Sequence, residues 1–222
     1  TLQPTRWNSE LMRSSATSDR EPRKAIARRM GPAGAPAWHA ILDGAELIMR
    51  EEGYAALNAK RIAERTGIKR QLVYYYFSDI DDLYVQLFHR IADRALDHLK
   101  SALENKHPLR ETWDVGINTF DQTLIVESMA LANRNAKLRD AMLEYIRISS
   151  DLQISALRKV LNGRPLPKVE ISLAALATIA TWVALGIQRE AALKIDTGHA
   201  EVLKLVESFL SACEQPPSEP AD

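Results

Sequence analysis

The sequence is poor in cysteine and lacks long uncharged apolar runs. Cys213 is the only cysteine, so the chain can form neither an internal disulfide nor a cysteine-based metal cluster. A single thiol suits the reducing cytoplasm. No window reaches the roughly 18 uncharged apolar residues of a membrane-spanning helix, and residues 1–36 lack the apolar segment of a signal peptide. We therefore expect a cytoplasmic protein with no membrane contact.

The scarcity of glycine bears on secondary structure. With only nine glycines, long stretches contain neither glycine nor proline, which favours helices over short strands. No segment alternates between apolar and polar residues for long enough to predict a strand, whereas apolar residues recur at every third or fourth position. We predict an all-α chain with helices at residues 37–52, 58–65, 69–75, 79–103, 108–132, 134–162, 168–194 and 198–213.

Charge is balanced overall but unevenly distributed. The chain has 29 basic and 29 acidic residues, so it is not coated with phosphate-binding groups. Residues 1–36 carry seven lysines or arginines against three acids, and residues 58–77 carry five against one, Glu64. Two local basic segments in a neutral chain indicate a confined DNA footprint rather than general binding of polyanions.

The second basic segment has the spacing of a helix-turn-helix. Two crossing helices need a small residue where they meet and a turn residue that tolerates positive φ. Ala63 and Gly67 fit these positions, Asn58 is a predicted N-cap, and Ser78 or Asp79 caps the next helix. The exposed remainder is a cluster of hydrogen-bond donors: Lys60, Arg61, Arg65, Lys69, Arg70 and Gln71. By spacing alone, a basic solvated helical hairpin remains the alternative.

The sequence offers little support for an enzyme. Its five histidines show no His-Glu-x2-His spacing, and no glycine-rich phosphate loop occurs. The paired carboxylates Glu51-Glu52 and Asp81-Asp82 lie at predicted helix ends, where solvation or the helix dipole explains them. We therefore predict no catalytic residues, no metal site and no cofactor. An architectural DNA binder without a ligand is the other alternative, and it would show only weak sequence preference.

A longer string of residues resembles a known family of proteins. Residues 41–83 read ILDGAELIMREEGYAALNAKRIAERTGIKRQLVYYYFSDIDDL. An apolar helix ending in Glu-Gly-Tyr is followed by Ile-Ala-x3-Gly-Ile, by Leu-Val-Tyr-Tyr-Tyr-Phe and by an acidic pair. This string closely resembles the DNA-binding domain of TetR family regulators. The resemblance implies a three-helix DNA-binding domain (37–82) and a helical ligand-binding and dimerisation domain (83–213). Composition predicts a disordered basic arm before them (1–36) and an acidic disordered tail after them (214–222).

The resemblance also assigns roles to individual residues. Lys60 matches a position that contacts bases or phosphates. Lys69, Arg70 and Gln71 open the recognition helix, where Lys69 or Arg70 can donate to guanine and Gln71 can pair with adenine. The resemblance also implies an apolar contact from Leu72 to a thymine methyl. It further implies that Tyr74 and Tyr76 reach the DNA through their hydroxyls. For Tyr75, DNA contact and packing both stay open, and Phe77 is expected in the core.

Two features depart from the family pattern. The family commonly places a lysine at the start of its fourth helix to hold a phosphate, where this chain has Ile80. That contact is either absent or replaced by backbone amides of the helix start. The arm of residues 1–36 is also longer than usual. Its basic residues either enter the minor groove or belong to a solvated tail.

The resemblance implies that the later helices hold a small-molecule effector. The candidate lining residues would suit an apolar or aromatic ligand, although aromatic residues at helical spacing can equally form ordinary core: Trp113, Ile117, Phe120, Met142, Tyr145 and Trp182. Helices 168–194 and 198–213 are expected to pair with their copies in a homodimer. A small-residue face would permit close approach there: Ala174, Ala177, Thr181, Ala184 and Leu185.

The expected partners follow from these assignments. They are a double-stranded DNA operator, a small-molecule effector and a second copy of the chain. Two recognition helices about one DNA turn apart would read a palindrome. By resemblance, the regulator is a repressor that its effector releases from DNA, through movement of the helix at 79–103.

Overall fold

The computed structural model describes residues 32–119, 122–162 and 171–214, which contain helices and no strand. The predicted all-α class is confirmed. The elements are α1 (Pro36–Glu52), η2 (Tyr54–Ala56), α2 (Ala59–Thr66), α3 (Arg70–Tyr76), α4 (Ile80–Glu104), α5 (Pro108–Asp114), η3 (Val115–Thr119), α6 (Gln122–Ala132), α7 (Ala136–Leu161), α8 (Leu173–Ala192) and α9 (His199–Glu214).

The predicted boundary signals of the first helices are present. The Asn58 side chain accepts a hydrogen bond from the backbone N–H of Arg61 at 2.9 Å, which caps α2. Gly67 ends α2 with a φ of 70°. Of the two candidates at the start of α4, Asp79 is the cap, because its carboxylate accepts from the N–H of Asp82 at 2.7 Å.

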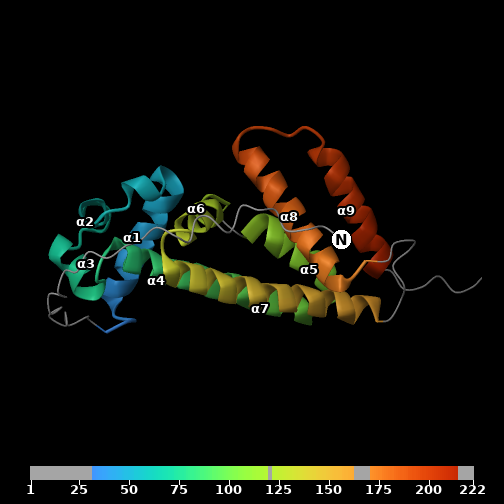
Figure 1. Cartoon of the computed structure of the whole chain (residues 1–222), viewed down its shortest axis with the longest axis horizontal. Helices are drawn as coiled ribbons and strands as arrows, with labels where there is room; N and C mark the ends of the chain where they lie inside the picture. The colour runs from blue at the N-terminus through green and yellow to red at the C-terminus, as the bar shows by residue number, and fades with distance from the viewer. Residues whose placement is uncertain (1–31, 120–121, 163–170, 215–222) are drawn as a thin grey trace, which may run out of the picture.

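The single helix predicted at 108–132 is wrong. Helix α5 ends at Asp114, a π turn (η3) occupies Val115–Thr119, and α6 begins at Gln122. The π turn holds β-branched residues beside Gly116, a combination with low helix propensity. Helix α6 packs against α1, α7 and α8, whereas α5 packs against α4, α7 and α9, so the two helices have different neighbours (Figure 1).

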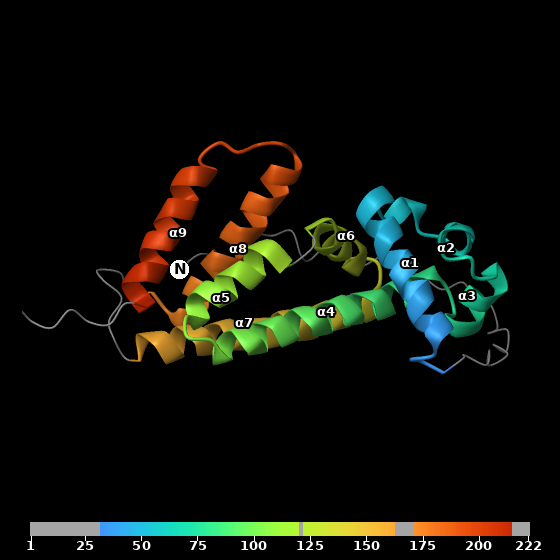
Figure 2. The same ribbon diagram turned by 180° about the vertical axis from the view of Figure 1, so that it is seen from behind.

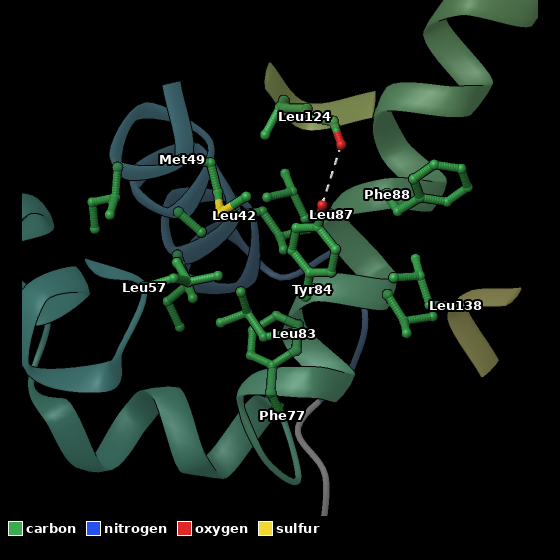
Figure 3. Close-up of a cluster of buried hydrophobic side chains, with 14 of the residues drawn as sticks. Leu42, Met49, Leu57, Phe77, Leu83, Tyr84, Leu87, Phe88, Leu124 and Leu138 are labelled. Atoms are coloured by element: carbon green, nitrogen blue, oxygen red, sulfur yellow. Dashed lines mark hydrogen bonds between the residues drawn. The ribbon is translucent and has the colours of Figure 1, made fainter. Parts of the chain in front are cut away.

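Two long helices connect the ends of the molecule. Helices α4 and α7 lie side by side, as both views show (Figures 1 and 2), with α1, α2 and α3 at one end and α8 and α9 at the other. The first core joins α1 to α4 and also takes in residues of α6 and α7, including Leu124 and Leu138 (Figure 3). The expected domain boundary at 82/83 therefore falls inside one continuous packing unit.

A second core lies between α5, α7, α8 and α9. Its buried members are Leu109, Ala156, Leu157, Leu161, Ala177 and Leu210. Glu214, which the sequence assigned to the tail, is the last residue of α9. Its Oε1 accepts from the backbone N–H groups of Leu109 at 2.8 Å and Arg110 at 3.2 Å. The end of α9 thereby caps the start of α5.

Two of the five residues expected to face a second copy, Ala177 and Ala184, instead pack inside the chain, whereas Ala174 is exposed. Ala177 and Ala184 are only 5% and 3% exposed. The Thr181 hydroxyl donates to Gln153 Oε1 of α7 at 3.0 Å. Small side chains let α8 approach α7 and the π turn, so this face is already occupied.

No helix in the described ranges has both the length and the apolar content needed to cross a bilayer.

Close approach of α1 and α2 depends on a glycine within α1. A Cβ at Gly44 would overlap Cγ2 of Thr66. Thr66 cannot easily move aside, because its χ1 is restricted and its hydroxyl donates to the Ile62 carbonyl at 2.7 Å. Gly44 thus sets how closely the helix-turn-helix packs against α1.

We expect Gly44→Ala to lower the free energy of unfolding by about 1–3 kcal/mol, the cost of inserting a methyl into a filled contact. Denaturant unfolding measures the change. Thr66→Ser removes Cγ2 but keeps the hydroxyl, so the double variant should recover most of the loss that Gly44→Ala causes. A stabilised Gly44→Ala protein, as helix propensity alone would give, would refute this account.

Candidate nucleic-acid interface

The start of α3 presents the predicted DNA-reading residues to solvent. Lys69, Arg70 and Gln71 are exposed, and Leu72 is 36% exposed. Lys60 on α2 is also exposed and lies 3.8 Å from Glu64, at the distance of a weak surface ion pair. Helix α3 therefore offers cationic, amide and apolar groups within one turn, the chemistry that reads base edges in a major groove.

The opposite face of α3 is firmly anchored. Val73 and Phe77 are each 1% exposed, and Ile62 of α2 is fully buried beside them. The Phe77 ring stacks on Trp38 of α1 with ring centroids 6.1 Å apart. The expectation that Phe77 is a core residue is confirmed. Because buried side chains fix α3, its exposed residues keep a defined orientation.

The three tyrosines of α3 differ in environment. Tyr74 and Tyr76 are half-buried against the first core, whereas Tyr75 is 46% exposed. The guanidinium of Arg70 lies 5.9 Å from the centre of the Tyr74 ring, within the range of a cation–π contact. Tyr74 thus orients Arg70.

Neighbouring arginines are already paired with acids of α1. Arg61 binds both carboxylate oxygens of Glu52, with its Nη2 2.7 Å from Oε1. These hydrogen bonds hold the pKa of Glu52 below its ordinary value. Arg65 lies 2.5 Å from Glu51. Within the described ranges, the two cations that open α3 have no such ion pair and remain available to DNA.

The start of α4 is unsuited to a phosphate contact. Ile80 is half-buried against the first core. The N–H of Asp82 is occupied by the cap Asp79, and the Asp81 carboxylate accepts from the Tyr54 hydroxyl at 2.9 Å. Burial and Asp81 together raise the pKa of Tyr54 to about 12. The carboxylates of Asp79, Asp81 and Asp82 all lie at this helix end, and their negative charge repels a phosphate. The backbone amides of the helix start therefore do not readily replace the lysine that the family commonly has here.

A buried carboxylate ties α1 to α4. Glu46 is 8% exposed, and its Oε1 accepts from Arg94 at 2.6 Å and from Arg50 at 2.9 Å. Its Oε2 accepts from Arg90 at 2.7 Å, while Arg90 also donates to Asp43 at 2.6 Å. Burial acts to raise the pKa of Glu46, but Arg94, Arg90 and Arg50 outweigh it, so the pKa lies below its ordinary value of 4.5. We call this group the Glu46 clamp.

Sequence reasoning missed the Glu46 clamp and the Gly44 contact. A signal for the clamp was present, since Glu46 follows Leu42 by four residues and precedes Met49 by three, so it lies within the apolar stripe of α1. An acid at such a position requires partners. Nothing in the local sequence shows that α4 supplies two of them.

The predicted ligand-lining residues are divided between the two cores. Trp113 is half-buried and packs on the second core, and Ile117 is half-buried in the π turn. Met142 and Tyr145 belong instead to the first core, where Tyr145 meets Phe88 edge-on at 6.3 Å between ring centroids. Burial raises the pKa of Tyr145.

The other two predicted lining residues stand apart. Phe120 lies outside the described residues. Trp182 is 58% exposed and lies on the face of α8 opposite the buried Ala177 and Ala184. Its position does not contribute to an enclosed site within one chain.

Comparison with known proteins agrees with this geometry. Residues 41–87 match the family described as bacterial regulatory proteins, tetR family. The fatty acid metabolism regulator protein of Bacillus subtilis (strain 168) is 23% identical over 119 residues, which make up 50% of this chain and 61% of that protein. The match thus spans less than two thirds of that relative's length.

Solved structures show the same fold. A TetR transcription regulator from Haloarcula marismortui has a TM-score of 0.65 at 18% identity, over 79% of this chain and 96% of that one. FadR from Bacillus subtilis, in complex with stearoyl-CoA, has a TM-score of 0.58 at 17% identity, over 71% of this chain and 88% of that one.

Residues 41–87 therefore form a DNA-binding helix-turn-helix domain of the type found in TetR family transcriptional regulators. The family resemblance found in residues 41–83 is confirmed. The family consists of regulators rather than enzymes, as predicted.

We expect Glu46→Gln to lower the free energy of unfolding by about 2 kcal/mol. Breaking a fully buried ion pair costs about 3–5 kcal/mol. We expect the smaller loss of about 2 kcal/mol because the Arg94 side chain is 51% exposed, and water weakens its interaction with Glu46. Glu144→Gln is the matched control, because Glu144 pairs with Arg147 on an exposed helix surface. Its effect should stay within about 0.5 kcal/mol. Equal effects of the two substitutions in denaturant unfolding would contradict the clamp.

The stabilisation by Glu46 should depend on pH. A carboxyl whose pKa is lowered by folding stabilises the folded state fully above its unfolded pKa, and this contribution is lost as pH falls through the folded pKa. The difference in unfolding free energy between wild type and Glu46→Gln should therefore be constant above about pH 5 and shrink below the ordinary value of 4.5. Unfolding curves recorded between pH 3 and pH 7 measure it, and a difference that grows on acidification would overturn the assignment.

Proposed function

We propose that the protein is a dimeric repressor that binds a palindromic operator and leaves it when a small molecule with an apolar part binds the helical domain. The observation that carries the DNA-binding half is the exposed, unpaired start of α3 on an anchored helix. Arg70 or Lys69 donates to guanine O6 and N7, and Gln71 pairs with adenine. Leu72 contacts a thymine methyl.

The remaining predicted contacts position the protein on the DNA backbone. Lys60 neutralises a phosphate from α2, and the hydroxyls of Tyr74 and Tyr76 reach the backbone from α3. Contacts of this kind add affinity without sequence preference. Specificity therefore rests on Arg70 and its neighbours, while Lys60 contributes mainly to the salt dependence of binding.

The dimer is supported by unpartnered apolar residues on α8 and α9. Ile179 and Trp182 are 51% and 58% exposed, and Leu205 of α9 is 70% exposed. Three large apolar side chains exposed on two adjacent helices are typical of an interaction surface. We therefore assign Trp182 to the dimer interface rather than to the ligand site.

The effector half is supported by a structural relative. FadR from Bacillus subtilis was solved with stearoyl-CoA, a ligand with a long apolar chain. An apolar effector also suits helices lined by Trp113 and Ile117. Binding would favour a position of α4 in which two copies of α3 are spaced wrongly for the operator.

Selection of binding sites from a random duplex library tests this function. We expect the full chain to enrich one sequence with two inverted half-sites whose centres lie about 10 base pairs apart or a multiple of it. Enrichment of no discrete sequence, together with steeply salt-dependent binding, would show an architectural DNA binder instead.

We expect Arg70→Ala to weaken binding to the selected operator at least ten-fold and to relax the preference at one base pair of each half-site, because a bidentate contact to guanine is lost. Arg147→Ala is the charge-matched control, since Arg147 is exposed and lies on α7, outside the helix-turn-helix. Fluorescence anisotropy on labelled duplexes measures both. Unchanged affinity for Arg70→Ala would mean that another face reads the DNA.

We expect Trp182→Glu to convert the dimer to a monomer, because it places a charge at the centre of the proposed apolar interface. Leu143→Glu is the control, as Leu143 is 59% exposed on α7 outside that surface. Sedimentation velocity gives the mass, and far-ultraviolet circular dichroism checks that helix content is retained. A helical Trp182→Glu protein that stays dimeric would place the interface elsewhere.

A further inference from the structure

The π turn and α8 meet through one glutamine. Gln188 Nε2 donates to the carbonyl of Gly116 at 2.9 Å and also to the carbonyl of Ile117. Both carbonyls belong to the π turn. Because a carbonyl oxygen can only accept a hydrogen bond, the NH2 group of Gln188 must face the two carbonyls. The orientation of the amide is therefore fixed, and its Oε1 faces away from the turn.

Two buried oxygen atoms, one on this glutamine and one on α5, have no protein partner in the part of the chain that the structure describes. They are Gln188 Oε1 and Thr112 Oγ1. Thr112 precedes Gly116 by four residues, so both lie on the same helical face. Leu109 and Trp113, which flank Thr112 on that face, pack on the second core. A Cβ placed on Gly116 would lie 4.0 Å from the Cβ of Ala184 on α8. Ala184 lies one helical turn before Gln188.

Buried acceptors and hydroxyls are nearly always hydrogen-bonded in folded proteins, so unpartnered ones require an explanation. Here they adjoin Trp113 and Ile117, in a helical domain whose structural relative was solved with stearoyl-CoA. A π turn is also an irregularity that is frequent at functional sites.

We propose that Gln188 Oε1 and Thr112 Oγ1 form the hydrogen-bonding subsite of the effector site, and that the effector presents an uncharged O–H or N–H donor there beside its apolar part. Gln188 Oε1 can only accept, so a donor is required. A carboxylate cannot supply one, and burying its charge beside these uncharged residues is unfavourable. This inference rests on the proposed ligand binding, and it adds the chemistry of the ligand.

The test uses the full chain without DNA and three probes of matched chain length: 1-octanol, 1-methoxyoctane and octanoate. The methyl ether keeps the oxygen of the alcohol but has no donor. Titration calorimetry should show 1-octanol binding about ten-fold tighter than 1-methoxyoctane, the factor expected for one hydrogen bond to a buried acceptor. Octanoate should bind no better than the ether. Equal affinities of alcohol and ether, or no binding of either, would overturn the proposal.

Two variants separate ligand binding from a structural role. Thr112→Val removes a hydroxyl without a protein partner, so the melting temperature of the free protein should stay the same or rise while 1-octanol affinity falls. Gln188→Met should bring the alcohol-to-ether ratio close to one. Gln153→Met is the matched control, because Gln153 is already bonded to Thr181, and its ratio should stay near ten.

Several results would count against the subsite. A Thr112→Val protein with a lowered melting temperature would assign the hydroxyl a structural role, such as binding a water molecule. An alcohol preference that survives in both Thr112→Val and Gln188→Met would place the donor contact elsewhere. Because no DNA is present, these outcomes are independent of operator selection, and failure of either experiment leaves the other interpretable.

Discussion

The attachment of α1 to α4 by the Glu46 clamp is the constraint on which the rest of the structure depends. Helix α1 carries the helix-turn-helix through the Gly44 contact and the Phe77 core, and α4 runs on beside α7 into the helical domain. Arg90 and Arg94 of α4 bind this carboxylate and fix the register of α1 on α4, while Arg50 binds it from α1 itself. Hydrophobic packing alone would allow these helices to slide, because it is not directional, whereas charge-assisted hydrogen bonds are geometrically specific.

This arrangement joins the two proposed activities through one core. The first core contains Leu42 of α1, Leu87 of α4 and Leu138 of α7, so the reading helix and the helical domain share packed residues (Figure 3). At this junction the Tyr84 hydroxyl donates to the Leu124 carbonyl at 3.4 Å. The proposed shift of α4 relative to α7 would therefore move α3. Close-packed cores move between discrete arrangements rather than deforming smoothly, which suits a regulator with a bound and a released state.

The sequence predicted the parts of this structure that depend on local patterns. The cap at Asn58, the turn at Gly67 and the anchoring of Phe77 all follow from nearby residues, as does the exposure of Arg70. The change from α-helix to π turn after Asp114 was missed, because Leu109, Trp113 and Ile117 keep a helical period across it. The inward face of Ala177 and Ala184 was missed too, since a small-residue stripe has the same pattern whether its partner is α7 or a second copy. The α4 partners of Glu46 lie more than 40 residues away and the partners of Gln188 more than 70, where periodicity carries no information.

The central claim is that the helical domain and the reading helix are coupled through α4. Measuring operator affinity with and without stearoyl-CoA tests it most directly, with calorimetry to establish that the acyl-CoA is bound. The account predicts that saturating stearoyl-CoA raises the operator Kd by at least about five-fold, the lower end of usual allosteric coupling. By reciprocity, operator should weaken stearoyl-CoA binding by the same factor. Stearoyl-CoA that binds the protein yet leaves the operator Kd unchanged would contradict the account.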